Sequence, residues 1–259
     1  MHAMEQRFLQ TPRKCNEGMN ISVIVPAYNE ERLLGQTLET IRKAMTAFSD
    51  VGWTSELIVC DNNSTDRTAD LARQGGAMVV FESINQISRA RNSGAAAATG
   101  QWLVFVDADS QPSAELFADV IGQIKTEQCL AGGSTIQFDG NNPMGARAIQ
   151  SWNWLSRCFG LLAGSFIFCN AAAFREIGGF NNELFASEEL DLTKRLKQLA
   201  RRRGKKIVIL DRNPLVTSAR KLQLYTPWEM LWFFARTIVT GGRALKRRES
   251  CHVWYDGRR

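Results

Sequence analysis

Short apolar segments alternate with segments of helical periodicity through the first half of the chain. The apolar segments are residues 21–25, 56–60, 77–81 and 102–106. Strands and helices that alternate at this spacing form βαβ units with right-handed crossovers and a mostly parallel sheet. Residues 102–106 are apolar at every position, which is typical of a strand covered on both faces. We therefore predict an α/β fold built on a mostly parallel central sheet.

The second half of the chain is less regular but mixes both kinds of element. Strands are predicted at residues 129–138 and 206–210, and helices at residues 146–163 and 188–203. No internal repeat and no linker rich in proline or serine interrupts these elements. We therefore expect one domain over residues 19–220.

The two ends of the chain differ in composition from this domain. Residues 1–18 are polar, and we expect a disordered extension there. Residues 221–259 are aromatic and basic, and Pro227 suits the first turn of a helix that would run to Arg243. Such a helical appendix resembles an interfacial helix, which predicts contact with an anionic membrane surface. The alternatives are a helix packed over the ligand side of the sheet and a contact in a homodimer.

The bulk composition limits the partners and the compartment. A hydrophobic fraction of 44% and a charged fraction of 22% are those of an ordinary globular protein. The net charge of +6 favours phosphate-bearing partners or an anionic membrane surface, and we expect no nucleic-acid binding. The 6 cysteines include no C-x-x-C pair, and we find neither a signal peptide nor an apolar run long enough to span a bilayer. These features predict a cytoplasmic protein, at most peripheral at the inner face of a membrane.

Polar residues directly follow three of the predicted strands, at residues 28–30, 61–63 and 107–109. Ligands of open α/β sheets bind beyond the carboxyl ends of the strands. In an extended chain Asp107 and Asp109 would project to the same side, about 7 Å apart. Two carboxylates so placed can hold Mg²⁺ or Mn²⁺ against a diphosphate, although aspartates are also common where a strand leaves a sheet. The two neighbouring polar strand ends favour the metal–diphosphate interpretation.

The second strand end separates this chain from dinucleotide-binding folds. Asp61 could accept a hydrogen bond from a base imide or from a ribose hydroxyl, as an acidic residue does in Rossmann dehydrogenases. Those enzymes need G-x-G-x-x-G after the first strand, whereas residues 26–30 read Pro-Ala-Tyr-Asn-Glu and the next glycine is Gly35. A P-loop is absent from the sequence as well. The chain therefore encodes neither kind of glycine-rich phosphate cradle.

Two further groups of charged residues could take part in chemistry. Arg89 and Arg91 could neutralise a diphosphate by bidentate contact, or simply cover the start of a helix. Glu188, Glu189 and Asp191 begin a predicted helix, where the macrodipole already favours anions. One of these three carboxylates could instead act as a general base, and Glu188 and Asp191 share a helix face. The histidines stand only near the two ends of the chain, which argues against a histidine-based site.

In order and spacing, six motifs resemble glycosyltransferase family 2. They are Val25–Glu30, Asp61–Asp66, Ala90–Gly94, Asp107–Asp109, Gly178–Asn181 and Glu188–Leu192. The resemblance covers roughly residues 20–220 and implies a GT-A fold, a three-layer sandwich. It also implies an inverting transfer of a sugar from a nucleoside-diphosphate sugar, with UDP favoured, to a glycan, a lipid-linked acceptor or a small molecule.

The resemblance implies a role for each matching residue. The nucleotide-sugar pocket would be lined by Pro26, Ala27, Tyr28, Glu30, Asp61, Asn63, Asp107 and Ala108. Asp61 would bind the base, Arg91 would lie near the diphosphate, and Asp109, with Asp107 beside it, would ligate the divalent cation.

Two departures from the family pattern affect the site. The family base is usually the second residue of a Glu-Asp pair, and here that residue is Glu189, so Glu188 and Asp191 remain rival bases. Many members place a metal-binding histidine after the last strand, and residues 215–221 contain none. Arg220 and Lys221 could supply positive charge to the leaving diphosphate instead.

These departures keep a second hypothesis open. The chain could be a catalytically inactive sugar-nucleotide-binding or scaffold protein of the same fold. A nucleotidyltransferase would also use acidic metal ligands, but it would normally carry a glycine-rich basic loop after the first strand. That loop is absent here.

Overall fold

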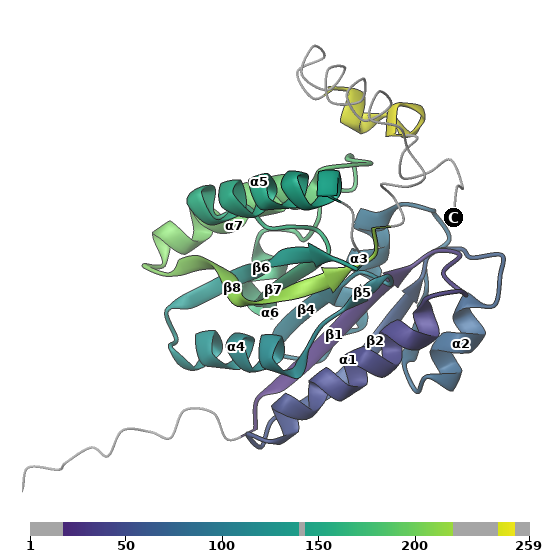
Figure 1. Cartoon of the computed structure of the whole chain (residues 1–259), viewed down its shortest axis with the longest axis horizontal. Coiled ribbons are helices and arrows are strands. Elements are labelled where there is room, and N and C mark those ends of the chain that lie inside the picture. Colours follow the sequence, from purple (N-terminus) through teal and green to yellow (C-terminus); the bar gives the residue numbers. More distant parts are fainter. Residues whose placement is uncertain (1–17, 140–142, 220–242, 252–259) are drawn as a thin grey trace, which may run out of the picture.

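A computed structural model of the chain describes residues 18–139, 143–219 and 243–251 (Figure 1). Within them the strands form one sheet in the order β3-β2-β1-β4-β7-β6-β8-β5. The strands are β1 (Asn20–Ala27), β2 (Thr54–Asp61), β3 (Met78–Phe81), β4 (Trp102–Val106), β5 (Ser110–Gln111), β6 (Cys129–Phe138), β7 (Phe166–Asn170) and β8 (Lys206–Thr217).

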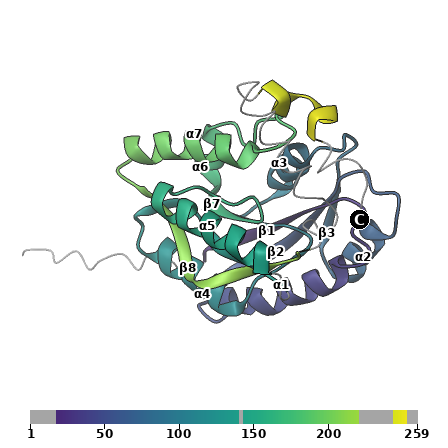
Figure 2. The ribbon, with the colours of Figure 1, turned by 45° about the horizontal axis from the view of Figure 1, so that its top comes forward.

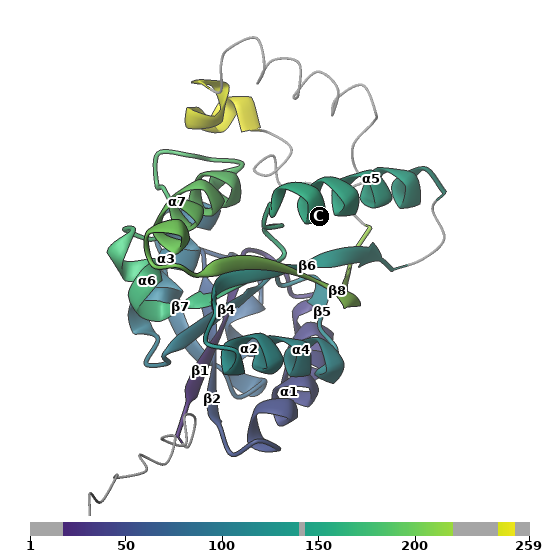
Figure 3. The same cartoon turned by 90° about the vertical axis from the view of Figure 1, so that its left-hand side faces the viewer.

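Helices cover both faces of this sheet, as a three-layer sandwich requires (Figures 2 and 3). The helices are α1 (Leu34–Ser49), α2 (Thr68–Gln74), α3 (Ile87–Ala97), α4 (Ala114–Lys125), α5 (Pro143–Phe159), α6 (Ala171–Glu176) and α7 (Glu188–Arg202). Helices α1, α2 and α4 lie on one face, and α3, α5, α6 and α7 lie on the other (Figure 3). Two short 3-10 helices, η1 (Arg243–Lys246) and η2 (Arg248–Cys251), follow towards the C-terminus.

The alternation of side chains along β1 divides the core between the two faces. Val23 and Val25 pack into the cluster that contains Leu34 of α1 and Phe117 of α4. Ile24, between them, packs into the cluster on the α3 and α7 face. All of these side chains are fully buried, and burial of one such side chain contributes about 1.5–3 kcal/mol. The central strands therefore anchor both layers of helices.

The first half of the sheet confirms the predicted parallel βαβ arrangement. Strands β3, β2, β1 and β4 are parallel neighbours, and all five residues of β4 are buried. The other half is more mixed than the sequence predicted. Strand β7 runs antiparallel to both β4 and β6, and β5 runs antiparallel to β8. Strand β7 was not predicted from the sequence, because its five residues follow closely on the apolar end of the helix predicted at residues 146–163.

Several predicted boundaries also change. Helix α2 begins at Thr68 without a side-chain cap, and the nearby Ser64 hydroxyl accepts from the Asn29 amide. Strand β8 runs on to Thr217, beyond the predicted end at residue 210. Helix α4 is capped by Ser113, whose side chain accepts from the Leu116 amide.

The expected helix from Pro227 to Arg243 lies outside the described residues, apart from its last position. The same holds for most of the predicted N-terminal extension and of the C-terminal appendix. None of the helices in the described ranges is long and apolar enough to cross a membrane.

The topology brings the polar strand ends together at one edge of the sheet. Strands β1, β2 and β4 are parallel, so their carboxyl ends meet there. Because β7 is antiparallel, its amino end lies at the same edge, where the Asp107 amide donates to the Ser165 carbonyl over 3.2 Å. The loop at residues 160–165 thus lies at the same edge of the sheet as the polar residues that follow β1, β2 and β4.

Candidate active site

The Asp107–Asp109 segment forms a tight turn at the end of β4. The Ser110 amide donates to the Asp107 carbonyl over 3.1 Å, which closes the turn. The prediction that the two aspartates project from an extended chain was therefore wrong: β4 ends at Val106, as predicted, but the chain turns directly after Asp107 instead of continuing extended. Both aspartates are partly exposed, while Ala108 is buried. The Asp109 carbonyl accepts from the Ser218 amide, so the turn lies beside the end of β8.

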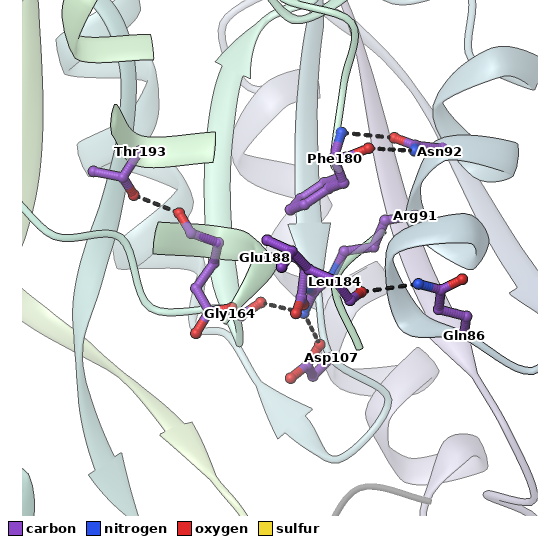
Figure 4. Close-up of polar contacts among 10 residues, drawn as sticks. Gln86, Arg91, Asn92, Asp107, Gly164, Phe180, Leu184, Glu188 and Thr193 are labelled. Carbon is purple, nitrogen blue, oxygen red and sulfur yellow. Dashed lines mark hydrogen bonds and ion pairs between the residues drawn. The ribbon is translucent and has the colours of Figure 1, made fainter. Parts of the chain in front are cut away.

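The Arg91 guanidinium occupies the centre of the site (Figure 4). Its Nη1 donates to Glu188 Oε1 over 2.6 Å, and its Nη2 donates to Asp107 Oδ1 over 2.9 Å and to the Gly164 carbonyl over 2.8 Å. The guanidinium carbon also lies 5.2 Å from the centre of the Phe180 ring. Burial opposes the charge, but the carboxylates of Asp107, Glu188 and Glu189 outweigh it and raise the pKa of Arg91 above its ordinary value. Arg91 is therefore a buried, permanently charged link between the end of β4 and the start of α7.

These contacts bear on the diphosphate role expected for Arg91. Its side chain is only 1% exposed, and both terminal nitrogens are already engaged. Its Nε has no hydrogen-bond partner among the described residues. The geometry favours a positioning role for Arg91, holding Asp107 and Glu188 in place, and direct contact with a diphosphate stays a prediction.

The three acidic residues at the start of α7 have different surroundings. Glu188 is 3% exposed and bound to Arg91. Asp191 pairs with Arg195 one turn along the same helix, over 2.7 Å. Glu189 has no ion-pair partner within the described part of the chain. Of the three rival bases, Glu189 is thus the one without an ion pair among the described residues, although the charge of Arg91 still acts on it.

The Glu189 carboxyl lies in the same site as Arg91. A methyl group built on Gly164 would stand 3.2 Å from Arg91 Nη2 and 3.7 Å from Glu189 Cδ, so both groups crowd this glycine. Burial of the carboxyl group, and then the negative charge of Glu188, raise the pKa of Glu189 to about 8. Part of the Glu189 side chain still reaches solvent. A carboxyl with these properties is suited to take a proton near neutral pH.

The residues predicted to hold a nucleotide come together at the ends of β1 and β2. Ala27 pairs with Asp61 in the sheet, and both are buried. Asn29 takes a left-handed conformation, with φ at 51°, and its Oδ1 accepts from the Thr65 amide over 2.8 Å. Asp61 Oδ1 accepts from the Ser64 amide over 3.1 Å. These bonds hold the loop after β1 against the loop after β2.

The other residues expected in this pocket lie on the same two loops. Glu30 is 6% exposed, and its amide donates to the Thr68 hydroxyl. Pro26 is buried within β1, Tyr28 is partly exposed, and Asn63 is exposed with φ at 65°. Arg220 and Lys221, expected near the leaving diphosphate, lie outside the described residues.

The available carboxylates limit how a cation could be bound. Among the described residues no group of three or more His, Cys, Asp or Glu side chains could hold a metal ion. Asp107 is bonded to Arg91, and Asp109 is the second carboxylate of the turn and a candidate ligand. Carboxylate oxygen suits Mg²⁺ and Mn²⁺, which commonly take their remaining ligands from substrate phosphates and water.

Two residues that support the site, Gln86 and Gly164, were not predicted from the sequence, and a third, Asn92, was given no role. Gly164 accepts from Arg91, and Gln86 and Asn92 of the α3 region hold the loop before α7. Asn92 stands within a motif that the sequence had singled out, but Gln86 and Gly164 carry no such signal. Their contacts join segments that are between 73 and 98 residues apart in the sequence.

Solved structures of similar fold define the class of this protein. The chain resembles a mannosyltransferase from Pyrobaculum calidifontis, solved with GDP-Man and Mn²⁺, with a TM-score of 0.64 and 19% identity over 87% of this chain and 62% of that one. It also resembles TarS residues 1–349 of S. aureus, solved with UDP-GlcNAc, with a TM-score of 0.62 and 18% identity over 92% of this chain and 71% of that one. The chain thus has the GT-A glycosyltransferase fold.

Sequence similarity identifies the family within this class. Residues 22–175 match the family model of glycosyl transferase family 2, and this chain belongs to that family. Validoxylamine A glucosyltransferase of Streptomyces hygroscopicus subsp. limoneus is 30% identical over 113 residues, which are 41% of this chain and 24% of that protein. The chain spans about a quarter of the length of this relative, and about a quarter of the length of another curated relative that it matches.

Proposed function

We propose that this chain is an inverting glycosyltransferase that moves a sugar from a nucleoside-diphosphate sugar to a hydroxyl acceptor. The single observation that carries the proposal is the Arg91 link, which joins Asp107 on the donor side to Glu188 beside the candidate base. Such a link fixes the distance between the two reacting partners before either is bound. Membership of the family and the nucleotide sugars bound by proteins of similar fold support the same reaction.

In this reaction Glu189 would take the proton of the acceptor hydroxyl. The acceptor oxygen then forms a bond to the anomeric carbon from the side opposite the diphosphate. The bond from that carbon to the diphosphate oxygen breaks, and its electron pair leaves with the nucleoside diphosphate. Glu188 and Asp191 are held by Arg91 and Arg195, so their role would be to orient the start of α7.

We assign the metal-holding role to Asp109. A divalent cation, Mg²⁺ or Mn²⁺, would supply positive charge to the departing diphosphate when bound. The oxygen ligand in the turn and the Mn²⁺ in the similar mannosyltransferase structure support this assignment. Asp107, bonded to Arg91, would instead face the ribose or the donor sugar.

The donor base would be read by Asp61 at the end of β2. Its carboxylate is only 6% exposed and keeps one oxygen on the Ser64 amide, so it is oriented in advance. We favour a UDP-sugar, because a carboxylate can accept the imide hydrogen of uracil. GDP-sugars are the main competitor, since one protein of similar fold binds GDP-Man.

The acceptor that we favour is a glycan or a lipid-linked sugar at an anionic membrane surface. Helix α5 supports this choice, because its apolar residues Trp154, Leu155 and Phe159 are exposed, Trp154 by 62% and Phe159 by 58%. Flotation of the protein with anionic vesicles tests the membrane part. If the protein does not float, the membrane surface is rejected and the acceptor is a glycan or another small molecule in solution.

The central experiment measures nucleoside-diphosphate release. A thermal-shift screen of UDP-, GDP- and dTDP-sugars with Mn²⁺ first identifies the donor, since ligand binding raises the melting temperature. Slow release of the diphosphate to water should then be measurable without an acceptor, and Glu189→Gln should suppress it. Binding without any release, even with a range of acceptor sugars present, would instead support an inactive sugar-nucleotide-binding protein.

A further inference from the structure

Gln86 stands at the start of α3 but does not cap that helix. Its backbone is extended, with φ at −157° and ψ at 126°, and its side chain makes no capping hydrogen bond. The side chain is nevertheless buried, with an exposed fraction of 2%. A buried amide must find partners elsewhere, because an unpaired polar group in the interior is costly. The positions of these hydrogen-bond partners indicate what the Gln86 side chain does in the structure.

The Gln86 side chain binds the loop that precedes α7. Its Nε2 donates to the Asn182 carbonyl over 2.8 Å. It also donates to the Leu184 carbonyl over 2.9 Å (Figure 4). Its Oε1 accepts from Arg89 Nε over 3.1 Å, so both ends of the amide are engaged. We call residues 180–187 the acceptor-side loop, since it leads directly into Glu188 and Glu189.

The Gln86 backbone binds the loop that follows β2. Its amide donates to Asn62 Oδ1 over 2.8 Å. Asn62 is next to Asp61, its amide donates to the Ala27 carbonyl, and its Nδ2 donates to the Ile84 carbonyl over 2.6 Å. We call residues 61–66 the donor-side loop. A single buried residue therefore contacts the donor-side loop through its backbone and the acceptor-side loop through its side chain.

A second amide of α3 restrains the same loop. Asn92 Oδ1 accepts from the Phe180 amide, and Asn92 Nδ2 donates to the Phe180 carbonyl and to Asn182 Oδ1, each over 2.9 Å. The loop then passes through Ser187, whose φ of 58° is strained for a residue with a side chain. Strained backbone persists only where its surroundings hold it. The contacts of Gln86 and Asn92 provide such a restraint directly before the candidate base.

We infer that Gln86 is a positioning residue that couples the two loops, so that a nucleotide bound at Asp61 orders the loop that leads into Glu189. The inference rests on the proposed function, because it needs a nucleotide on the donor-side loop. A coupling of this kind is a free energy shared between two sites, and it must appear as a change at one loop when the other is occupied. A merely structural Gln86 would stabilise the fold equally with and without nucleotide.

Hydrogen exchange followed by mass spectrometry tests the coupling with UDP and Mn²⁺ as the probe. In the wild type the probe should slow exchange in both the donor-side loop and the acceptor-side loop. In Gln86→Met, which keeps the length but removes the amide, the donor-side loop should keep its protection. The acceptor-side loop should lose most of it, with local exchange faster by about tenfold.

Two further variants separate positioning from general stability. Gln86→Glu keeps an acceptor for Arg89 but removes both donors to the loop, and it should behave like Gln86→Met. Asn153→Leu is the matched control, since Asn153 Nδ2 donates to the Ile136 carbonyl over 2.9 Å and binds α5 to β6. The control should leave the UDP response of both loops unchanged.

The outcomes distinguish the two proposals. If wild-type protein with UDP, and likewise with GDP, shows no protection of the donor-side loop, the proposed function fails. If the donor-side loop is protected but the acceptor-side loop of the wild type does not respond, or responds in the Gln86 variants as strongly as in the wild type, the coupling is refuted. In UDP-glucose turnover, Gln86→Met should lower kcat about tenfold with an unchanged KM for the donor. An equal loss in Asn153→Leu would also overturn the inference.

Discussion

Arg91 donates to the Glu188 carboxylate over 2.6 Å, and the two side chains are only 1% and 5% exposed. An ion pair this well buried cannot be broken cheaply, because either partner alone would be left charged without water. The Glu188 carboxylate is therefore engaged by Arg91 and is a poor candidate for a group that accepts the acceptor proton. This engagement supports the proposal that its neighbour, Glu189, is the base.

Removal of the Arg91 charge should destabilise the fold strongly. Arg91→Met leaves Glu188 and Asp107 without their cation, so the free energy of unfolding should fall by about 3–5 kcal/mol. Urea unfolding measures this loss. Lys43→Met is the control, since Lys43 pairs with Glu39 on the surface, and its loss should stay below about 1 kcal/mol. Similar losses in the two variants would show that Arg91 is not a buried link.

Replacement of Glu189 and of Asp191 should separate the roles of these two acidic residues. Glu189→Gln should lower kcat for nucleoside-diphosphate release by about 10²–10⁴-fold, the usual contribution of a general base, without weakening donor binding. Asp191→Asn should change kcat little, because Asp191 only pairs with Arg195 along α7. Steady-state kinetics with the donor found by thermal shift decides between them. A larger loss in Asp191→Asn would return the base assignment to Asp191.

The parallel half of the site could be read from the sequence, and the antiparallel half could not. Asp61 and Asp107 were placed correctly because parallel neighbouring strands bring their carboxyl ends to one edge, whatever the rest of the chain does. Gly164 reaches that edge only because β7 enters the sheet antiparallel beside β4, a long-range pairing without a local signal. Gln86 donates to backbone carbonyl groups about a hundred residues away in the sequence. Every residue has a backbone carbonyl, so the sequence does not indicate which of them a buried amide binds.

The raised pKa of Glu189 gives a pH dependence with a definite sign. Burial and the charge of Glu188 raise it from 4.5 to about 8, so the folded protein binds a proton there that the unfolded chain releases near pH 4.5. The resulting stability is present at low pH and is lost as the pH rises towards 8. Activity should move the other way, since the base works only when ionised. The rate of diphosphate release should therefore increase with pH and level off above about pH 8.

Glu189→Gln provides the control for both pH effects. The glutamine cannot titrate, so the variant should gain stability over the wild type as the pH rises from 5 to 9. Thermal unfolding across this range measures the difference between the two proteins. If the difference is constant with pH, the Glu189 carboxyl does not carry a raised pKa.

Divalent cations should bind well only together with a nucleotide. The described residues offer no cluster of three ligands, and Asp107 is bonded to Arg91. Titration calorimetry with Mn²⁺ alone should show little heat, whereas Mn²⁺ with UDP present should bind at one site. Asp109→Asn should remove this UDP-dependent binding. Tight binding of Mn²⁺ without UDP would mean that residues outside the described ranges complete the site.

A side chain at Gly164 should disturb the site, because Arg91 and Glu189 both lie close to this glycine. An added methyl group would lie 3.2 Å from Arg91 Nη2, and Arg91 cannot move away without straining its bonds to Glu188 and Asp107. Gly164→Ala should therefore lower kcat about tenfold, since small displacements of catalytic groups are costly. Gly122→Ala is the matched control: a methyl group there, within α4, meets nothing within 4 Å, and the change should raise stability by about 0.5–1 kcal/mol with activity unchanged. Full activity in Gly164→Ala would mean that Glu189 and Arg91 do not meet at this glycine during turnover.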